Sequence, residues 1–204
     1  MAVVPAGEGL DAAEAALRGG EVIVMPTDTV YGVAVDPRMP GAVDRLFALK
    51  RRPRDMPLAV LVASEEQAAA CADLASAHPG ARAALRRFWP GGLTLVLPRA
   101  VGFGVDLGAA PDTVGVRCPD HPVPRALASR VGPLATTSAN LSGQETPATA
   151  GGVAAQLELP ADVVVLDDGP CAGAPSTVVD LTGPEPRLLR EGTVPWAELH
   201  PLLL

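Results

Sequence analysis

The segment 50–54 carries four positive side chains in a chain whose formal net charge is −7. The chain holds 16 lysine and arginine residues, and Lys50 is the only lysine among them. An ammonium and a guanidinium differ in reach, hydration and hydrogen-bond direction, so a lone lysine indicates a position where arginine would not serve. Lys50 and Arg52 could together face one anionic ligand, such as a polyphosphate or a carboxylate. The alternative is a solvated basic cap at a helix end, which the composition argues against.

Two further stretches concentrate polar side chains. Residues 134–143 begin with an apolar pair. Hydroxyl or amide groups then follow at Thr136, Thr137, Ser138, Asn140 and Ser142. Such groups contact anions at strand ends, but they also cap helices and form turns, and taken alone this stretch favours a helix cap. The hydroxyl-rich corner at 26–32, Pro-Thr-Asp-Thr-Val-Tyr-Gly, on its own predicts a turn.

The histidines and cysteines point to neither a metal site nor a redox site. His78, His121 and His200 each precede a proline in predicted loops or in the tail, without metal-ligand spacing. Three cysteines, far apart and without a CxxC pair, suggest neither a disulfide framework nor a zinc site. We therefore expect reduced structural thiols, no protein-held metal and no histidine acid–base chemistry.

The rest of the chain predicts the elements that position these residues. Hydrophobic periodicity with start and stop signals predicts helices over 8–17, 64–74, 81–89, 122–131 and 149–157, and a short helix that delivers Lys50. Short β-rich runs predict strands over 21–25, 58–62, 93–97, 113–117 and 163–166, with 176–181 and 187–190 paired as a hairpin. The glycine-rich segment 99–111 predicts a flexible or ligand-facing loop. Strands and helices alternate in an α/β pattern, and without a repeat or linker we expect one domain over 1–204.

Composition narrows the class of protein. With 48% hydrophobic and only 3% aromatic residues, the core must consist mainly of Ala, Val and Leu. No apolar run approaches the length of a membrane span and no leader is visible, so we expect a cytoplasmic protein without a membrane partner. The charge of −7 opposes general binding to nucleic acid, and any such contact would have to be local.

Seven motifs occur in an order and spacing that resemble the YrdC-like family. They lie at 26–32, 50–53, 89–94, 116–121, 138–140, 176–180 and 189–192. The likeness runs from about residue 10 to residue 194, and the chain looks like the short, single-domain form. The resemblance implies a twisted open mixed α/β sheet with flanking helices and a concave ligand-binding face.

The resemblance also implies an activity, that of an L-threonylcarbamoyladenylate synthase, which is a nucleotidyltransferase. Such enzymes use L-threonine, bicarbonate or CO2, and ATP with Mg2+ to form threonylcarbamoyl-AMP and pyrophosphate. A separate transferase complex then uses the product to modify tRNA. By this resemblance we expect hand-over to such a complex, at most a local contact with tRNA, and Mg2+ that arrives with ATP.

The motif matches assign roles to particular residues. Lys50 and Arg52 match the family's Lys-x-Arg pair, and Ser138 and Asn140 match its Ser-x-Asn pair; these are the expected catalytic residues. The residues expected to bind L-threonine are Thr27, Arg117, Ser138 and Ser176. The residues expected to bind ATP are Lys50, Arg52, Arg54, Thr113, Asn140 and Arg190. Attack of a carbamate on a phosphate brings anions together, so cations should dominate catalysis, and the carbamate oxygen needs no general base.

Two departures from the family pattern and two alternatives stay open. Met56 stands where relatives often have lysine. Arg51 stands where they often have glycine, and its extra bulk leaves the local backbone path undecided. One alternative is a non-enzymatic RNA-binding or ribosome-associated module of the same fold. The other is a carbamoyl-adenylate domain like those of hydrogenase-maturation carbamoyltransferases, although those are large multidomain chains.

Overall fold

A computed structural model describes residues 2–171 and 173–204. In this part of the chain ten strands form one sheet, in the order β1-β8-β2-β3-β7-β4-β6-β5-β9-β10. The strands are β1 (Ala2–Pro5), β2 (Ile23–Met25), β3 (Gly32–Val35), β4 (Ala59–Leu61), β5 (Leu93–Pro98), β6 (Thr113–Arg117), β7 (Leu134–Ser138), β8 (Val164–Asp167), β9 (Thr177–Asp180) and β10 (Arg187–Arg190). Parallel and antiparallel pairs both occur, and the two edge strands do not meet, so the predicted open mixed α/β sheet is confirmed.

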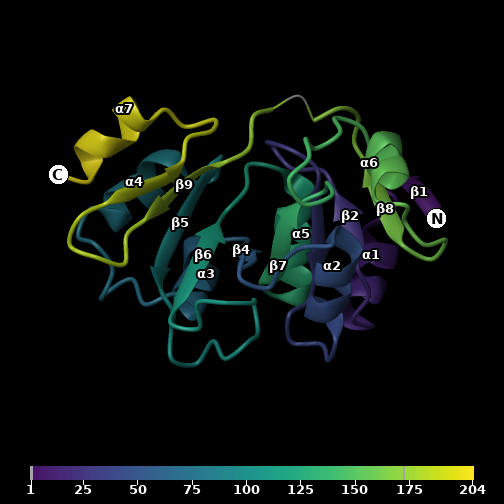
Figure 1. The fold of residues 1–204 in the computed structure, drawn as a ribbon, viewed down its shortest axis with the longest axis horizontal. Coiled ribbons are helices and arrows are strands. Elements are labelled where there is room, and N and C mark those ends of the chain that lie inside the picture. The colour runs from purple at the N-terminus through teal and green to yellow at the C-terminus, as the bar shows by residue number, and fades with distance from the viewer. Residues whose placement is uncertain (1, 172) are drawn as a thin grey trace.

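Helices flank this sheet on both faces. They are α1 (Leu10–Arg18), α2 (Ala42–Lys50), α3 (Glu65–Cys71), α4 (Ala81–Phe88), α5 (Pro122–Val131), α6 (Ala150–Gln156) and α7 (Trp196–Leu199), followed by a 3-10 turn at His200–Leu202. Figure 1 shows α7 and the β9/β10 end at one side of the molecule and β1 with α6 at the other. No helix within residues 2–171 and 173–204 has the length and apolar character that crossing a membrane requires.

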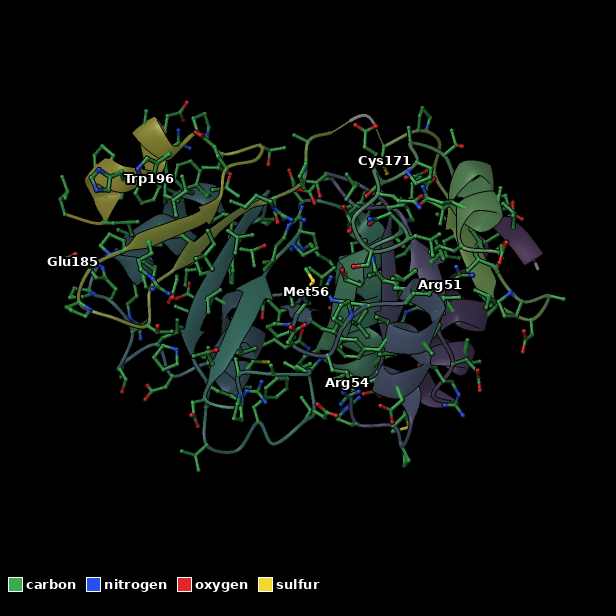
Figure 2. The ribbon with its side chains drawn as sticks, viewed as in Figure 1. Arg51, Arg54, Met56, Cys171, Glu185 and Trp196 are labelled. Atoms are coloured by element: carbon green, nitrogen blue, oxygen red, sulfur yellow. The ribbon has the colours of Figure 1, made fainter. Side chains whose placement is uncertain are left out.

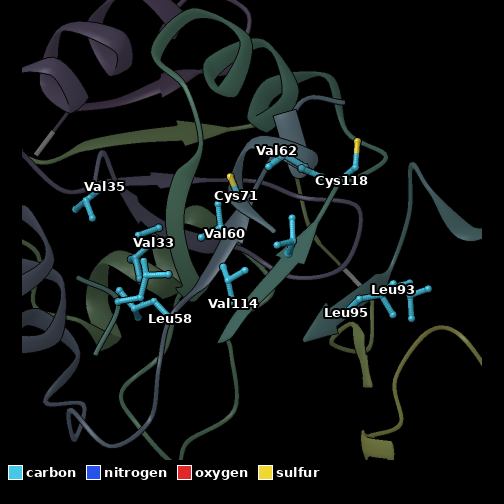
Figure 3. Close-up of a cluster of buried hydrophobic side chains, with 14 of the residues drawn as sticks. Val33, Val35, Leu58, Val60, Val62, Cys71, Leu93, Leu95, Val114 and Cys118 are labelled. Atoms are coloured by element: carbon cyan, nitrogen blue, oxygen red, sulfur yellow. The ribbon is translucent and has the colours of Figure 1, made fainter. Parts of the chain in front are cut away.

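Alternation along the strands divides the buried side chains into two cores. Ile23 and Met25 of β2 pack in the smaller core, with Leu17 of α1 and Leu127 of α5. Val24 belongs to the larger core, which also contains residues of α2, α3 and α4. Figure 3 shows part of that larger core around β4 and β6. Since successive strand residues point to opposite faces, a sheet covered on both sides requires the near-continuous apolar strands seen in the sequence.

Several predicted elements agree with the structure to the residue. The strand over 113–117, the helix over 122–131 and the strand over 187–190 are all present, and the C-terminal hairpin is confirmed by the antiparallel pairing of β9 with β10. The helix predicted over 64–74 begins as expected, where the Ser64 hydroxyl accepts a hydrogen bond from the Gln67 N–H. It ends at Cys71, three residues early, because Ala72 turns extended and pairs with Arg99.

Arg51 ends α2 in the left-handed conformation, with φ 49° and ψ 40°. Its N–H donates to the Ala48 carbonyl (3.1 Å) and the Arg52 N–H donates to the Phe47 carbonyl (3.0 Å), which is the Schellman arrangement in which glycine is favoured. The backbone therefore follows the path that a glycine would take, and the departure at Arg51 leaves this path intact. The Arg51 side chain is exposed and lies 3.7 Å from Glu158.

Candidate active site

A cavity of about 550 Å³ lies over the face of the sheet formed by β3, β7, β4, β6, β5 and β9. Its floor consists of alternate residues brought side by side by the strand register. Gly32 lies opposite Ser138, and Ala59 lies opposite both Gly115 and Thr136. Small residues at Gly32, Ala59 and Gly115 leave the middle of this face open, and the volume falls in the range of small-molecule sites.

Most of the predicted site residues meet in this cavity. Those that line it are Thr27, Arg52, Thr113, Arg117, Ser138, Ser176 and Arg190. Lys50, Arg54 and Asn140 do not line it. The structure thus brings hydroxyl groups and cations from five separate stretches of the chain together, and it places the lone lysine behind the cavity wall.

Lys50 is buried, with 1% of its surface exposed, beneath the turn that follows β7. Its ammonium donates to the Ser138 carbonyl and to the Asn140 side-chain oxygen, the latter at 3.3 Å. The expectation that Lys50 and Arg52 project together from the helix end therefore holds only for Arg52. The α2 helix ends at Lys50, so the two side chains leave the backbone on different sides of a left-handed residue.

Burial, reinforced by the nearby charge of Arg52, lowers the pKa of Lys50 to about 7. Unfolding restores a pKa near 10.5, so between these values the unfolded chain binds one more proton than the folded one. We therefore expect the free energy of unfolding to rise with pH over this window by roughly 1.4 kcal/mol per pH unit. Below and above the window Lys50 should make no contribution to the pH dependence. Chemical denaturation at several pH values measures this, and Lys50→Met should flatten the slope. Equal slopes in the two proteins would contradict a depressed pKa.

Asn140 connects Lys50 to the cavity. Its side-chain oxygen accepts hydrogen bonds from the Ser138 hydroxyl (2.5 Å), Lys50 and Thr146, and its amide donates to the carbonyls of Leu141 (2.8 Å) and Gln144 (2.7 Å). The helix-cap interpretation of this stretch is wrong, because β7 leads into a turn and no helix follows until Ala150. Asn140 instead fixes the geometry of Ser138, which does line the cavity.

Arg54 lies away from the cavity. Its guanidinium pairs with Asp44 (2.6 Å) and with Asp106, and it lies 4.8 Å from the centre of the Phe47 ring. Figure 2 shows Arg54 at the lower margin of the molecule and Met56 near its centre. Met56 lines the cavity, whereas Arg54 is occupied in holding two surface segments together.

Arg117 is the most enclosed cation in the cavity, with 6% of its surface exposed. Its guanidinium donates to the Asp28 carboxylate (2.6 Å), the Thr29 hydroxyl (2.9 Å) and the Gly91 carbonyl (3.0 Å). A guanidinium has five N–H donors, so these contacts fix its plane and leave donors for a ligand. Asp28 had no predicted role: its motif was noted, but nothing in the sequence links it to a partner 89 positions away.

A second polar group joins β5, β9 and β10. The Arg190 guanidinium donates to the Ser176 carbonyl (3.0 Å) and hydroxyl (3.1 Å), and that hydroxyl lies 2.9 Å from the Thr94 hydroxyl. The β9/β10 register shifts between Leu188 and Arg190, and such an irregularity can re-aim a side chain. Desolvation lowers the pKa of Arg52, which is partly buried, and it also lowers the pKa of Arg190, although that residue stays exposed on one side.

Arg99 also lines the cavity, and only its place at the start of a glycine-rich loop could have indicated this role. Its guanidinium donates to the carbonyls of Thr113 (3.1 Å) and Val105 (2.8 Å) and has no carboxylate within ion-pair distance in the described part of the chain. Arg52, Arg99, Arg117 and Arg190 face a single lining carboxylate, Asp55. The cavity is therefore electropositive within an acidic protein, and suits a ligand with several negative charges.

The fold and cavity define an α/β protein with a small-molecule site built for an anionic ligand. Comparison with known proteins agrees: a model of the Sua5/YciO/YrdC family, described as "Telomere recombination", matches residues 15–192. The chain belongs to this family.

Individual relatives cover most of the chain. A Mycobacterium leprae protein is 46% identical over 198 residues, which span 96% of this chain and 88% of that protein. A Bacillus subtilis protein named threonylcarbamoyl-AMP synthase is 40% identical over 186 residues, which span 89% of this chain but 53% of the relative.

Two solved structures share the fold. Pyrococcus abyssi Sua5, solved in complex with L-threonine, is 35% identical with a TM-score of 0.85 over 95% of this chain and 57% of its own. Escherichia coli YciO is 25% identical with a TM-score of 0.83 over 96% of this chain and 92% of its own. The chain therefore spans little more than half of the Pyrococcus protein and nearly all of the Escherichia protein.

Proposed function

We propose that this protein is an L-threonylcarbamoyladenylate synthase. One observation carries the proposal: in a family member, the cavity is lined by hydroxyl groups and by Arg52, Arg99 and Arg190, which form no salt bridge within residues 2–171 and 173–204. The Bacillus subtilis relative named threonylcarbamoyl-AMP synthase and the threonine complex of Pyrococcus abyssi Sua5 support the same assignment. The reaction joins L-threonine, bicarbonate or CO2, and ATP, and releases pyrophosphate.

The proposed binding mode follows the two polar groups of the cavity. L-Threonine takes the end formed by Arg117, Thr27 and Ser176, where the remaining guanidinium donors meet its carboxylate. ATP takes the part of the cavity lined by Arg52, Thr113 and Arg190, and Arg99 also belongs to the lining. Arg190 donates to the Ser176 hydroxyl, so the two substrates would meet at this pair, and the carbamate would face the α-phosphate there.

The chain's own residues supply positioning and charge. Arg52 and Arg190 screen the repulsion between carbamate and phosphate and fix the direction of approach, which is where preorganised cations contribute most. Lys50 holds Ser138 through its carbonyl and, with Asn140, sets the wall beside the reacting groups. Arg54 contributes to this site only by bracing the segment that carries Arg52.

The lining residues fit Mg2+ that enters the site bound to the phosphates of ATP. No group of three or more His, Cys, Asp or Glu in the described residues could hold a metal, and Asp55 is the lining carboxylate. Mg2+ commonly binds through substrate phosphates with one or two carboxylates. When bound it neutralises phosphate charge, and Asp55 is the residue that would hold it.

The test is a pyrophosphate-release assay. Purified protein with ATP, L-threonine, bicarbonate and Mg2+ should release pyrophosphate and form threonylcarbamoyl-AMP. Release that ignores threonine and bicarbonate would indicate a different adenylating enzyme, including a carbamoyl-adenylate domain. No release, together with salt-dependent RNA binding, would favour the non-enzymatic alternative.

Amino-acid preference tests the hydroxyl group of the site. The initial rate with L-threonine should be about tenfold higher than with serine, since one missing methyl group costs about 1 to 3 kcal/mol. The rate with valine should be far lower, because valine has no hydroxyl group and leaves the buried hydroxyl groups of the site without a hydrogen-bond partner. Initial rates with each amino acid at fixed ATP measure this. Equal turnover of valine and threonine would show that Thr27 and Ser176 do not read the substrate hydroxyl.

Gly115 tests the open middle of the cavity. A Cβ there would have its nearest neighbours, Ala59 and Thr94, at an ordinary 3.7 Å, so Gly115→Ala should fold and work nearly normally. Gly115→Val adds two methyl groups over the floor and should lower kcat/KM by about tenfold or more. Steady-state kinetics of both variants, with thermal melts, measure this. A fully active valine variant would mean that the substrates bind elsewhere.

We also propose where the product goes. The adenylate passes to a tRNA-modifying transferase complex in the cytoplasm, with at most a local contact between this protein and tRNA. The net charge of −7 supports only a small basic contact area. Transfer of labelled threonylcarbamoyl to tRNA should require the partner complex, and direct transfer by this protein alone would contradict the proposal.

A further inference from the structure

Several arginines of this acidic protein have no carboxylate partner, and five of them line cavities. Among residues 2–171 and 173–204, the arginines outside the salt bridges are Arg45, Arg52, Arg86, Arg87, Arg99, Arg125 and Arg190. Arg45 donates to a backbone carbonyl and Arg87 lies over the Phe88 ring. Arg52, Arg99 and Arg190 line the main cavity. Arg86 and Arg125 line a second cavity.

This second cavity has a volume of about 230 Å³ and shares no lining residue with the first. Arg86 of α4 and Arg125 of α5 line it from different elements, and both residues are exposed. Trp89 forms another wall, and its indole N–H is fixed by the Leu93 carbonyl at 2.7 Å. Glu65 is the one acidic residue of the lining, and it lies 3.6 Å from Arg82.

We propose that the Arg86/Arg125 cavity binds a small phosphate-class oxyanion that retains a proton. A tetrahedral oxyanion can accept hydrogen bonds from two directions at once, whereas a planar carboxylate is matched by a single guanidinium fork. Glu65 is an acceptor only when ionised, so it favours an anion with an O–H to donate. The volume is below the usual range for sites of nucleotide size.

The two cavities adjoin at the end of β6. Arg117 lines the first and Cys118, the next residue, lines the second. Gly91 joins them: its N–H donates to the Cys118 carbonyl (2.9 Å) and its carbonyl accepts from Arg117 (3.0 Å). The oxyanion site rests on its own residues and not on the proposed synthase activity, so each can fail without the other.

The direct test uses Trp89 fluorescence. The chain has two tryptophans, so Trp196→Phe leaves Trp89 as the reporter. Inorganic phosphate at millimolar concentrations should change its emission saturably, and Arg86→Gln with Arg125→Gln should weaken this response about tenfold or more, as expected when charge-assisted hydrogen bonds are removed. Arg87→Gln, a neighbouring surface change, and Arg190→Gln, in the main cavity, should leave the response unchanged.

A comparison with sulfate shows whether the site selects a protonated oxyanion or any small anion of similar charge. Sulfate has no O–H at neutral pH, so it should bind more weakly than phosphate, and Glu65→Gln should reduce that difference. A response lost in Arg190→Gln, one that persists in the Arg86/Arg125 double variant, or no saturable response to phosphate would overturn the site. Equal affinity for sulfate and phosphate would overturn the role of Glu65 and with it the protonated class of ligand.

Discussion

Replacement of Lys50 by arginine is expected to lower kcat by about two orders of magnitude, because it would displace the turn that carries Ser138 and so misplace the reacting groups. Lys50 is the chain's only lysine, and its ammonium occupies a closed space between the Ser138 carbonyl and the Asn140 oxygen. A guanidinium is larger and planar, so it cannot meet both acceptors without moving the turn that carries Ser138. The substitution therefore keeps a positive charge at position 50 but changes the position of the Ser138 turn.

The matched control is Arg51→Lys, one position along. That side chain is exposed and only its distant contact with Glu158 changes, so its kcat should stay within about twofold of the unaltered protein. Steady-state kinetics with thermal melts compare the two variants. Near-normal turnover of a folded Lys50→Arg protein would show that the site needs only positive charge.

Arg117→Met is expected to lower the free energy of unfolding by about 3 to 5 kcal/mol, because it leaves the Asp28 carboxylate enclosed without its partner. The side chains of Arg117 and Asp28 are 7% and 16% exposed, so water cannot replace the lost contacts fully. The same change should abolish the use of L-threonine at ordinary concentrations, while ATP binding should be weakened much less. Chemical denaturation and nucleotide-binding titration measure the two effects.

Arg187→Met provides the matched control, since Arg187 pairs with Asp180 at a similar 2.7 Å but its side chain is 71% exposed. The Asp180 carboxylate is 12% exposed, but it keeps hydrogen bonds from the Thr182 N–H and hydroxyl when Arg187 is removed, so the loss should be about 0 to 1 kcal/mol. Adding Asp28→Asn to Arg117→Met removes the stranded charge and should restore part of the stability without restoring threonine use. A loss for Arg117→Met no larger than that for Arg187→Met would contradict the enclosed pair.

Local sequence signals predicted the elements but not every contact between them. The α/β alternation, the 113–117 strand and the C-terminal hairpin follow from periodicity and turn residues. Strand β1 was missed, because Ala2–Pro5 is short and becomes a strand only by pairing with β8, far along the chain. The early end of α3 has the same cause, since Ala72 is drawn into a pairing with Arg99.

The site shows the same division. Motif residues such as Ser176 and Arg190 were found because they stand in recognisable patterns. The burial of Lys50 was not predicted, since it depends on a turn 88 positions away. Arg54 was assigned to ATP on charge alone, and the two carboxylates that it contacts, 10 and 52 positions away, could not be identified from the sequence. Spacing identifies chemistry, but the partners that compete for a side chain come from tertiary structure.

The position of β9 in the sheet affects how the protein gains activity during synthesis. β9 is parallel to β5 and next to it, with Leu93 opposite Thr177, so about eighty residues separate neighbours in the sheet. Until β9 and β10 have been made, β5 has an unpaired edge, and Ser176 and Arg190 are missing from the cavity. Long-range parallel pairing is slow to form and leaves exposed edges open to aggregation. The nascent chain therefore assembles its cavity last, and during that interval β5 is the edge that chaperones would have to protect.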